Sequence, residues 1–187
     1  MAIRSIATYT GLVWDSLVEM LGLDPDAEET QSAVRSTWIQ PGQPGFLITD
    51  DIVFFRIMTG GDQYDQKVYL EHGAVDSIAH YTRVITLILT AYGPSAPDNL
   101  ERIRTCFIAG FGTLNLKAQN IFPVINPGSV IRAPELFEGQ FWERADFSII
   151  MYAKEDTSVA IPGIEQAEIT IIADDDERRT IEWQTSP

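Results

Sequence analysis

Residues 81–112 have the sequence YTRVITLILTAYGPSAPDNLERIRTCFIAGFG, which predicts a strand that ends in a turn and is followed by a helix. Alternate positions of residues 83–93 fall on opposite faces, because successive side chains of a strand point to opposite sides of a sheet. The wholly apolar face consists of Ile85, Leu87, Leu89 and Ala91. The other face mixes apolar residues with threonines. Such a strand requires a helical layer on one side and tolerates a wetter surface on the other.

The turn after this strand carries the signals of a helix start. Gly93 and Pro94 end the strand, and Ser95 precedes Asp98 by three positions, the spacing of a capping box. Pro97 suits the first helical turn, which has no internal use for its missing N–H. The apolar residues at helical spacing are Leu100, Ile103, Phe107 and Phe111. The segment therefore predicts a strand and a helix that pack against each other.

A second strand, residues 143–153, repeats this alternation. Its apolar face consists of Ala145, Phe147, Ile149, Met151 and Ala153. We expect the two strands to pair antiparallel beneath one helical layer, because both carry one continuous apolar face. Residues 52–58 are apolar on both faces, which predicts a strand in the middle of the sheet.

Weaker patterns predict the remaining elements. Thr10 is the expected cap of the first helix, Gly22 its end, and Pro123 favours an edge position for its strand. In chain order, these patterns predict a helix at residues 8–23, a strand at 34–39, an edge strand at 121–125, a helical turn at 134–139, a linker at 157–162 and a last strand at 164–172.

The expected fold class is α/β (α+β), with a mixed, mainly antiparallel β-sheet packed by helices on one face. A chain of 187 residues suits a single domain over residues 1–187. Within it we expect an acidic insertion at 24–33, an extended hairpin lobe at 60–80, and a C-terminal strand and tail at 157–187.

Composition limits the classes of partner. The chain has 27 acidic and 13 basic residues and a net charge of −14, which disfavours tight binding to nucleic acid phosphates. Its single cysteine, Cys106, excludes an internal disulfide and a cysteine-based zinc cluster. No apolar run approaches the roughly 20 residues of a membrane span, and the N-terminus does not resemble a leader. We expect a soluble protein made in a cytoplasm, with no membrane partner.

Residues with catalytic potential are few. His72 and His80 have no neighbouring nucleophile motif, and Cys106 is expected to be an inert, packed residue. Asp62, Asp65 and Glu71 could ligate a hard cation, but their spacing matches no calcium loop and favours a solvated loop. We therefore expect no cofactor, no metal ion and no enzymatic activity.

The order of several short motifs resembles the phage neck terminator family. The matching pieces are a helix at 12–21 followed by Trp38-Ile39-Gln40-Pro41, the strand that ends in Tyr92-Gly93-Pro94, the run FWERADFSI at 141–149, and a final strand at 164–169. The chain departs from the family in the insertion at 24–32 and the lobe at 60–79.

The resemblance implies a structural virion protein of the neck and tail junction, assembled in the host cytoplasm. Subunits of this kind form a ring, expected to be a hexamer, that caps the tail tube, ends its polymerisation and joins the tail to the head. The implied partners are other copies of the chain, the tail tube protein, the neck connector or adaptor proteins and a sheath. DNA would pass through the bore of the ring without specific binding.

Two sets of residues are candidates for this role. The last strand has apolar residues on both faces, so it could extend a sheet edge of the next subunit or be an ordinary strand of its own sheet. Its candidate interface residues are Ile164, Gln166, Glu168, Ile169 and Ile171. The candidate acids facing a bore are Asp50, Asp51, Asp62 and Asp65.

Two other classes remain open. Another virion component, such as a head-completion or tail-tube protein, would share the acidity, but a tube protein would form long polymers. A small enzyme or ligand-binding domain would instead require a deep pocket that contains a perturbed carboxylate or histidine.

Overall fold

The computed structural model of the protein describes residues 4–37, 45–60, 68–72, 76–124, 126–137, 139–160, 166–172 and 178–184. Its helices are α1 (Ile6–Leu21), α2 (Glu28–Ala33), α3 (Ala96–Ala109) and α4 (Leu114–Ala118). Its strands are β1 (Val34–Ser36), β2 (Ile52–Gly60), β3 (Tyr69–His72), β4 (Asp76–Tyr92), β5 (Ile121–Pro123), β6 (Ile131–Arg132), β7 (Glu135–Phe137), β8 (Gln140–Trp142), β9 (Arg144–Ala160), β10 (Gln166–Ile172) and β11 (Arg178–Gln184).

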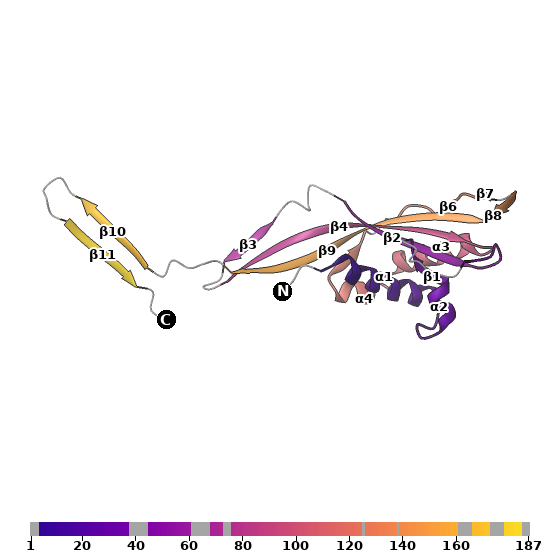
Figure 1. The fold of residues 1–187 in the computed structure, drawn as a ribbon, viewed down its shortest axis with the longest axis horizontal. Helices are drawn as coiled ribbons and strands as arrows, with labels where there is room; N and C mark the ends of the chain where they lie inside the picture. The colour runs from indigo at the N-terminus through magenta and orange to yellow at the C-terminus, as the bar shows by residue number, and fades with distance from the viewer. Residues whose placement is uncertain are drawn as a thin grey trace.

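A seven-stranded sheet forms the body of the fold. Its strand order is β1-β2-β4-β9-β5, with β3 also paired to β4 and β6 to β9. Among the described strands of this sheet, β1 and β2 pair in parallel and the other pairs are antiparallel. The expected mixed, mainly antiparallel fold is therefore confirmed. Two hairpins, β7–β8 and β10–β11, form separate sheets, and Figure 1 shows β10 and β11 set apart from the body.

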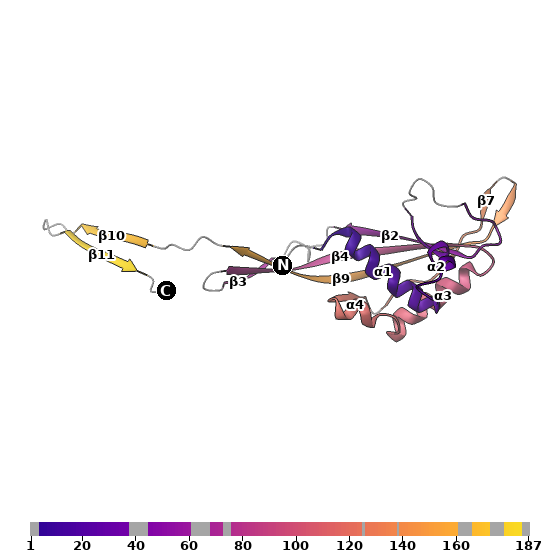
Figure 2. The ribbon, with the colours of Figure 1, turned by 60° about the horizontal axis from the view of Figure 1, so that its bottom comes forward.

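The strands β4 and β9 pair along their whole length, from Asp76 opposite Ala160 to Tyr92 opposite Arg144. This confirms the antiparallel pair that the two alternating patterns predict. The register places Leu87 opposite Ile149, and both side chains are buried. The helices lie on one side of the sheet, and the core between them contains the apolar faces of both strands (Figures 1 and 2).

The structure confirms the predicted end of α1 but not the predicted N-terminal caps of α1 and α3. Gly22 ends α1 with a φ of 67°, as expected, but the cap is Ser5, whose Oγ accepts from Thr8 N at 3.2 Å. Thr10 lies inside the helix and donates to Ile6 O. Ser95 makes no side-chain cap for α3, so the expected capping box is wrong. The N–H of Ser95 instead donates to Asp51 Oδ1 at 2.8 Å.

Three other predictions need correction. Phe111 is 72% exposed because α3 ends at Ala109, before the apolar stripe would reach it. The expected helical turn at 134–139 is wrong, since Glu135 pairs with Trp142 in the β7–β8 hairpin. Residues 157–160 do not belong to a linker but continue β9, because their backbone pairs with β4. Residues 161 and 162 lie outside the described residues.

Candidate functional site

The ends of β4 and β9 extend beyond the helical layer as a narrow ribbon (Figure 1). The β4 part begins at Asp76, and β3 pairs with it from Ser77 to His80. Residues with large apolar side chains are exposed here, namely Val68, Tyr69, Leu70 and Ile78. The ribbon therefore presents apolar surface without the helical cover that the body provides.

A polar cluster fixes the ribbon where it leaves the body. The hydroxyl of Tyr9 in α1 donates to Glu155 Oε1 in β9, and the Glu155 side chain is almost fully buried. Arg4 Nε lies 3.3 Å from Glu155 Oε1, and Arg4 also donates to the Lys154 carbonyl at 2.7 Å. The Arg83 guanidinium stacks over the Tyr9 ring with 5.6 Å between its Cζ and the centroid. A buried carboxylate requires such partners because an unpaired buried charge is costly.

His80 joins the three strands of the ribbon. Its Nδ1 lies 2.7 Å from Asp156 Oδ1 in β9, and its Nε2 lies 3.2 Å from Glu71 Oε2 in β3. The hydrogen bond to Asp156 and the further bond to Glu71 raise the pKa of His80 above its ordinary value. Protonated His80 can donate to both carboxylates, so this arrangement fits a clamp between strands.

The side of the sheet opposite the helices, which we call the open face, is partly apolar. It carries Met58 of β2, Ile150 of β9 and Phe122 of β5, which are 47%, 45% and 45% exposed. Thr86 of β4 pairs with Met58 on one side and Ile150 on the other. Tyr152 pairs with Val84 and with Phe122 in the next row. We call four residues of this region the apolar patch, namely the exposed Met58, Phe122 and Ile150 and the half-buried Tyr152.

An aromatic cluster lies farther along the open face, away from the ribbon. Phe46 packs against Phe54, Tyr92 and Trp142 with ring centroids 5.5–5.7 Å apart. Arg144 stacks on Tyr92 and pairs with Glu135 at 3.0 Å. Gly45 and Glu135 complete, with three of these rings, a pocket of about 410 Å³. Its aromatic walls suit the side chain of a partner protein better than they suit acid–base chemistry.

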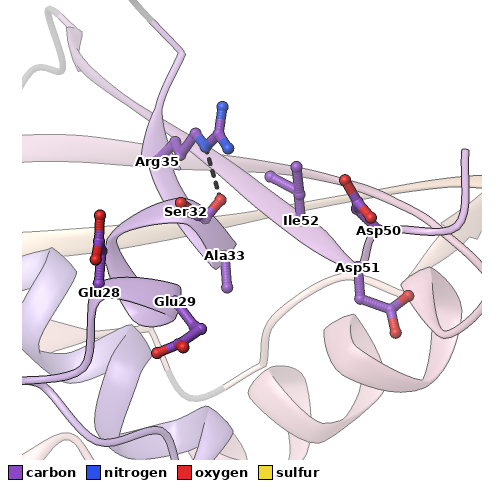
Figure 3. A pocket seen from close by; sticks show the side chains of 8 residues that line it. All are labelled: Glu28, Glu29, Ser32, Ala33, Arg35, Asp50, Asp51 and Ile52. Atoms are coloured by element: carbon purple, nitrogen blue, oxygen red, sulfur yellow. Dashed lines mark hydrogen bonds between the residues drawn. The ribbon is translucent and has the colours of Figure 1, made fainter. Parts of the chain in front are cut away.

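An acidic hollow of about 530 Å³ lies between α2 and the start of β2 (Figure 3). Glu28 and Glu29 of α2 line one side, and Asp50 and Asp51 line the other. Arg35 is the basic residue of the lining, and its Nε donates to Ser32 O at 2.6 Å. Four carboxylates around one guanidinium give this surface a net negative charge.

The predicted site residues are only partly brought together. Asp50 and Asp51 are neighbours at the hollow, and each accepts a backbone hydrogen bond, from Leu47 N and Ser95 N. Asp62, Asp65 and Ile164 lie outside the described residues. The other interface candidates, Gln166, Glu168, Ile169 and Ile171, lie in β10, which pairs with β11 and not with the seven-stranded sheet. Whether they contact another subunit stays a prediction.

Sequence reasoning missed three groupings. The Tyr9–Glu155 contact joins residues 146 positions apart, so no local pattern could indicate it. The His80 clamp and the aromatic cluster also combine distant segments. The strand register could have revealed the His80 clamp, because His80 lies opposite Asp156 once β4 and β9 are aligned. Cys106 is half-buried and packs against the core, as its position beside the apolar stripe suggested.

A search of the described residues finds no cluster of three or more histidine, cysteine, aspartate or glutamate side chains that could hold a metal ion. Among the helices of the same residues, none has the length and apolar character required to cross a membrane.

The fold and its surfaces define the structural class of this protein. It is a mixed α+β subunit with one helix-covered sheet face, one partly apolar open face and projecting strand pairs. The chain matches the family model described as phage neck terminator protein over residues 11–176. The protein therefore belongs to the phage neck terminator family and is a structural virion protein of the neck. No curated protein matches its sequence.

Proposed function

We propose that copies of this protein form a closed ring, a hexamer, that caps the finished tail tube and ends its polymerisation. The ring also joins the tail to the head. Its partners are the tail tube protein on one side and the neck connector or adaptor proteins on the other, with a sheath where the tail has one. The virion component is assembled in the host cytoplasm.

The observation that carries this proposal is that the chain presents two different surfaces, the open face and the ribbon. A closed ring needs two different surfaces on each subunit, because every subunit contacts its two neighbours through different patches. The open face offers exposed Met58, Ile150 and Phe122, whereas the ribbon of β3, β4 and β9 extends beyond the helical layer. Membership in the neck terminator family supports a role for such contacts in the virion neck.

The charge of the chain supports passage of DNA through the ring. Six copies at −14 each would carry about −84, and a negative bore would repel phosphate groups and prevent the genome from adhering. The hollow lined by Glu28, Glu29, Asp50 and Asp51 is an acidic surface that would suit such a bore. Specific binding of DNA is not expected.

Polymerisation of purified tail tube protein from the same phage tests the proposal. Adding the neck terminator protein should stop elongation and leave one ring at one end of each tube in electron micrographs. Native mass spectrometry of the protein alone should give a multiple of 20.9 kDa that corresponds to a closed ring. Tubes that continue to grow, or long polymers of the protein by itself, would refute the capping role and favour a tube protein.

A further inference from the structure

Arg56 of β2 is a cation that lacks a partner in the described part of the chain. Its Nε is buried and meets no hydrogen-bond acceptor there. The guanidinium groups of Arg4, Arg104, Arg132 and Arg144 each pair with a carboxylate, but none of the ion pairs among the described residues involves Arg56. A buried donor without an acceptor is costly, so an acceptor that reaches Arg56 from outside the chain would bind favourably.

Arg56 lies between two hollows of the open face. Their volumes are about 360 Å³ and about 430 Å³, and Arg56, Ile88, Thr90 and Arg144 line both. The register places Arg56 directly opposite Ile88 of β4. We call the two hollows together the Arg56 hollow. Its walls also include apolar and hydroxyl side chains, among them Phe54, Ile131, Ser129 and Ser148.

The lining of the Arg56 hollow has one uncompensated positive charge. Its charged members are Arg56, Arg144 and Asp146. Arg144 pairs with Asp146 at 3.1 Å and with Glu135 at 3.0 Å, so its charge is balanced within the chain. Asp146 Oδ1 also accepts from the Thr90 hydroxyl at 2.8 Å. The hollow therefore suits one carboxylate on a side chain with apolar neighbours, because a guanidinium binds a carboxylate through two parallel hydrogen bonds.

Glu71 of the ribbon has the complementary chemistry. Its side chain is 66% exposed, and its Oε2 contacts His80, so that Oε1 has no partner among the described residues. Glu71 pairs with Ile78, and Tyr69 lies two positions earlier on the same side of β3. Both of these neighbours are exposed. The ribbon therefore presents a carboxylate that is flanked by apolar side chains.

The other described charges on this side of the ribbon are less open than Glu71 or lie nearer the body. Asp156 binds His80 at 2.7 Å, the shorter of the two contacts of that ring, and its side chain is 45% exposed. Lys154 lies on the same side, two positions nearer the body on β9. Glu71 is therefore the carboxylate that this side of the ribbon presents most openly.

We propose that the guanidinium of Arg56 binds the Glu71 carboxylate of a second copy of the chain. The proposal rests on the ring described above and names the ion pair that links its neighbouring subunits. Arg56 pairs with Ile88 of β4. Glu71 pairs with Ile78, which lies ten positions earlier on the same strand. At about 3.3 Å per residue these positions are about 33 Å apart, so the two groups do not meet within one chain.

The surroundings of the two groups also match. Met58 of the apolar patch lies two positions from Arg56 on the same side of β2. Tyr69 and Ile78 can cover it when Glu71 reaches Arg56. Copies with a net charge of −14 repel each other at long range, so a contact that places an acid on an unpaired cation is favoured. Each copy then gives its ribbon and receives one, which is the head-to-tail contact that closes a ring.

A double-mutant cycle in the full chain tests the ion pair. R56Q and E71Q should each raise the protein concentration required for ring formation by at least about tenfold, as measured by native mass spectrometry. The variant with both changes should assemble no worse than the weaker single variant, because either change alone already removes the pair. An effect of E71Q through the His80 clamp would persist in the R56Q background. Additive losses, or single variants that assemble as the wild type does, would overturn the proposal.

R102Q is the matched control for R56Q. Arg102 is an exposed arginine of α3, so the control removes the same charge from the helical side of the sheet. It should leave the concentration required for ring formation within about twofold of the wild-type value. A loss as large as that in R56Q would assign the effect to net charge and would overturn the proposal. Circular dichroism should show the same fold in every variant.

Zero-length cross-linking identifies the group that position 56 contacts. R56K places an amine in the hollow, and a water-soluble carbodiimide joins that amine to a touching carboxylate as an amide. Isotope-labelled and unlabelled copies are mixed before the reagent is added. We expect a peptide pair that joins position 56 to Glu71 and contains one labelled and one unlabelled peptide. A link within one chain, a link to a carboxylate outside the ribbon, or rings without any link at position 56 would overturn the proposal.

A fluorescein-labelled DNA duplex tests whether Arg56 binds phosphate instead. Wild-type protein and R56Q should bind the duplex equally weakly in fluorescence anisotropy, because the net charge of −14 repels DNA. Duplex binding by the wild type that R56Q loses would assign Arg56 to the DNA backbone and would overturn the proposal.

The two proposals fail differently. If the ion pair is wrong and the capping role is right, R56Q and E71Q still form rings and stop tube growth as the wild type does. If the capping role is wrong and the ion pair is right, the mixed-isotope link forms while tubes continue to elongate in the presence of the protein.

Discussion

The Tyr9 hydroxyl donates a hydrogen bond to the Glu155 carboxylate, which joins the first helix to the strand that becomes the ribbon. Both side chains are buried. Burial, followed by the hydrogen bond to Glu155, raises the pKa of Tyr9 well above its ordinary value of 10.0. The phenol therefore stays protonated and remains a hydrogen-bond donor at neutral pH.

Replacing Tyr9 with Phe should destabilise the protein by about 1–3 kcal/mol, because the buried Glu155 carboxylate loses a hydrogen-bond donor. Urea unfolding followed by tryptophan fluorescence measures the free energy of unfolding. Tyr152→Phe is the control, since it removes a hydroxyl from a half-buried ring on the open face. Equal effects of the two variants would contradict the special role of the Tyr9 contact.

The His80 clamp should depend on pH. The hydrogen bond to Asp156, and after it the bond to Glu71, raise the pKa of His80 in the folded protein above its ordinary 6.5. The clamp is therefore fully present below about pH 6.5 and is lost as pH rises through the folded pKa. Protection of the β3 amide protons against hydrogen exchange, corrected for intrinsic rates, should fall over the same range.

Variants of Asp156 and Glu71 test whether these two carboxylates raise the pKa of His80. Asp156→Asn should lower the His80 pKa measured by NMR titration more than Glu71→Gln does, because the Asp156 bond is the larger contribution. His80→Gln should abolish the pH dependence of β3 protection. If β3 protection in His80→Gln keeps the same pH dependence, another titrating group is its cause.

Gly93 ends β4 in a conformation that requires glycine. Its φ is 108°, and a Cβ there would clash with the Asp50 carbonyl oxygen and lie 2.6 Å from Asp51 Oδ1. Gly93→Ala should destabilise the protein by more than about 1 kcal/mol. Gly11→Ala in α1 is the control, since a Cβ there meets nothing within 4 Å and should stabilise the helix by up to about 1 kcal/mol. Thermal unfolding by calorimetry should give shifts of opposite sign.

Asp51 should contribute to stability independently of any role in a bore. Its Oδ1 accepts from the N–H of Ser95 at the start of α3, so Asp51→Ala should cost about 0.5–2 kcal/mol. Asp51→Asn keeps an acceptor and should cost less. Glu29→Ala removes an exposed acid of the same hollow and should leave unfolding unchanged. A loss in Glu29→Ala as large as that in Asp51→Ala would contradict this assignment.

The local sequence pattern was sufficient to predict a strand where apolar residues alternate along the chain. The apolar face of Ile85, Leu87 and Leu89 predicted both the strand and its helical cover, because a continuous apolar face must be buried on one side. The same reasoning failed at residues 134–139 and 157–160, where pairing with another strand outweighs local propensity. Phe111 was wrongly placed in the core because periodicity does not locate the end of a helix.

The sequence by itself determined the central antiparallel pair, the mixed class of the fold and the resemblance to the neck terminator family. These features follow from alternation and from short motifs in a fixed order, which are properties of neighbouring residues. Only the tertiary structure decided that Glu155 meets Tyr9, that His80 bridges two carboxylates, and that β10 pairs with β11. Such contacts depend on strand register and on where separate segments meet in space, and the local sequence does not contain that information.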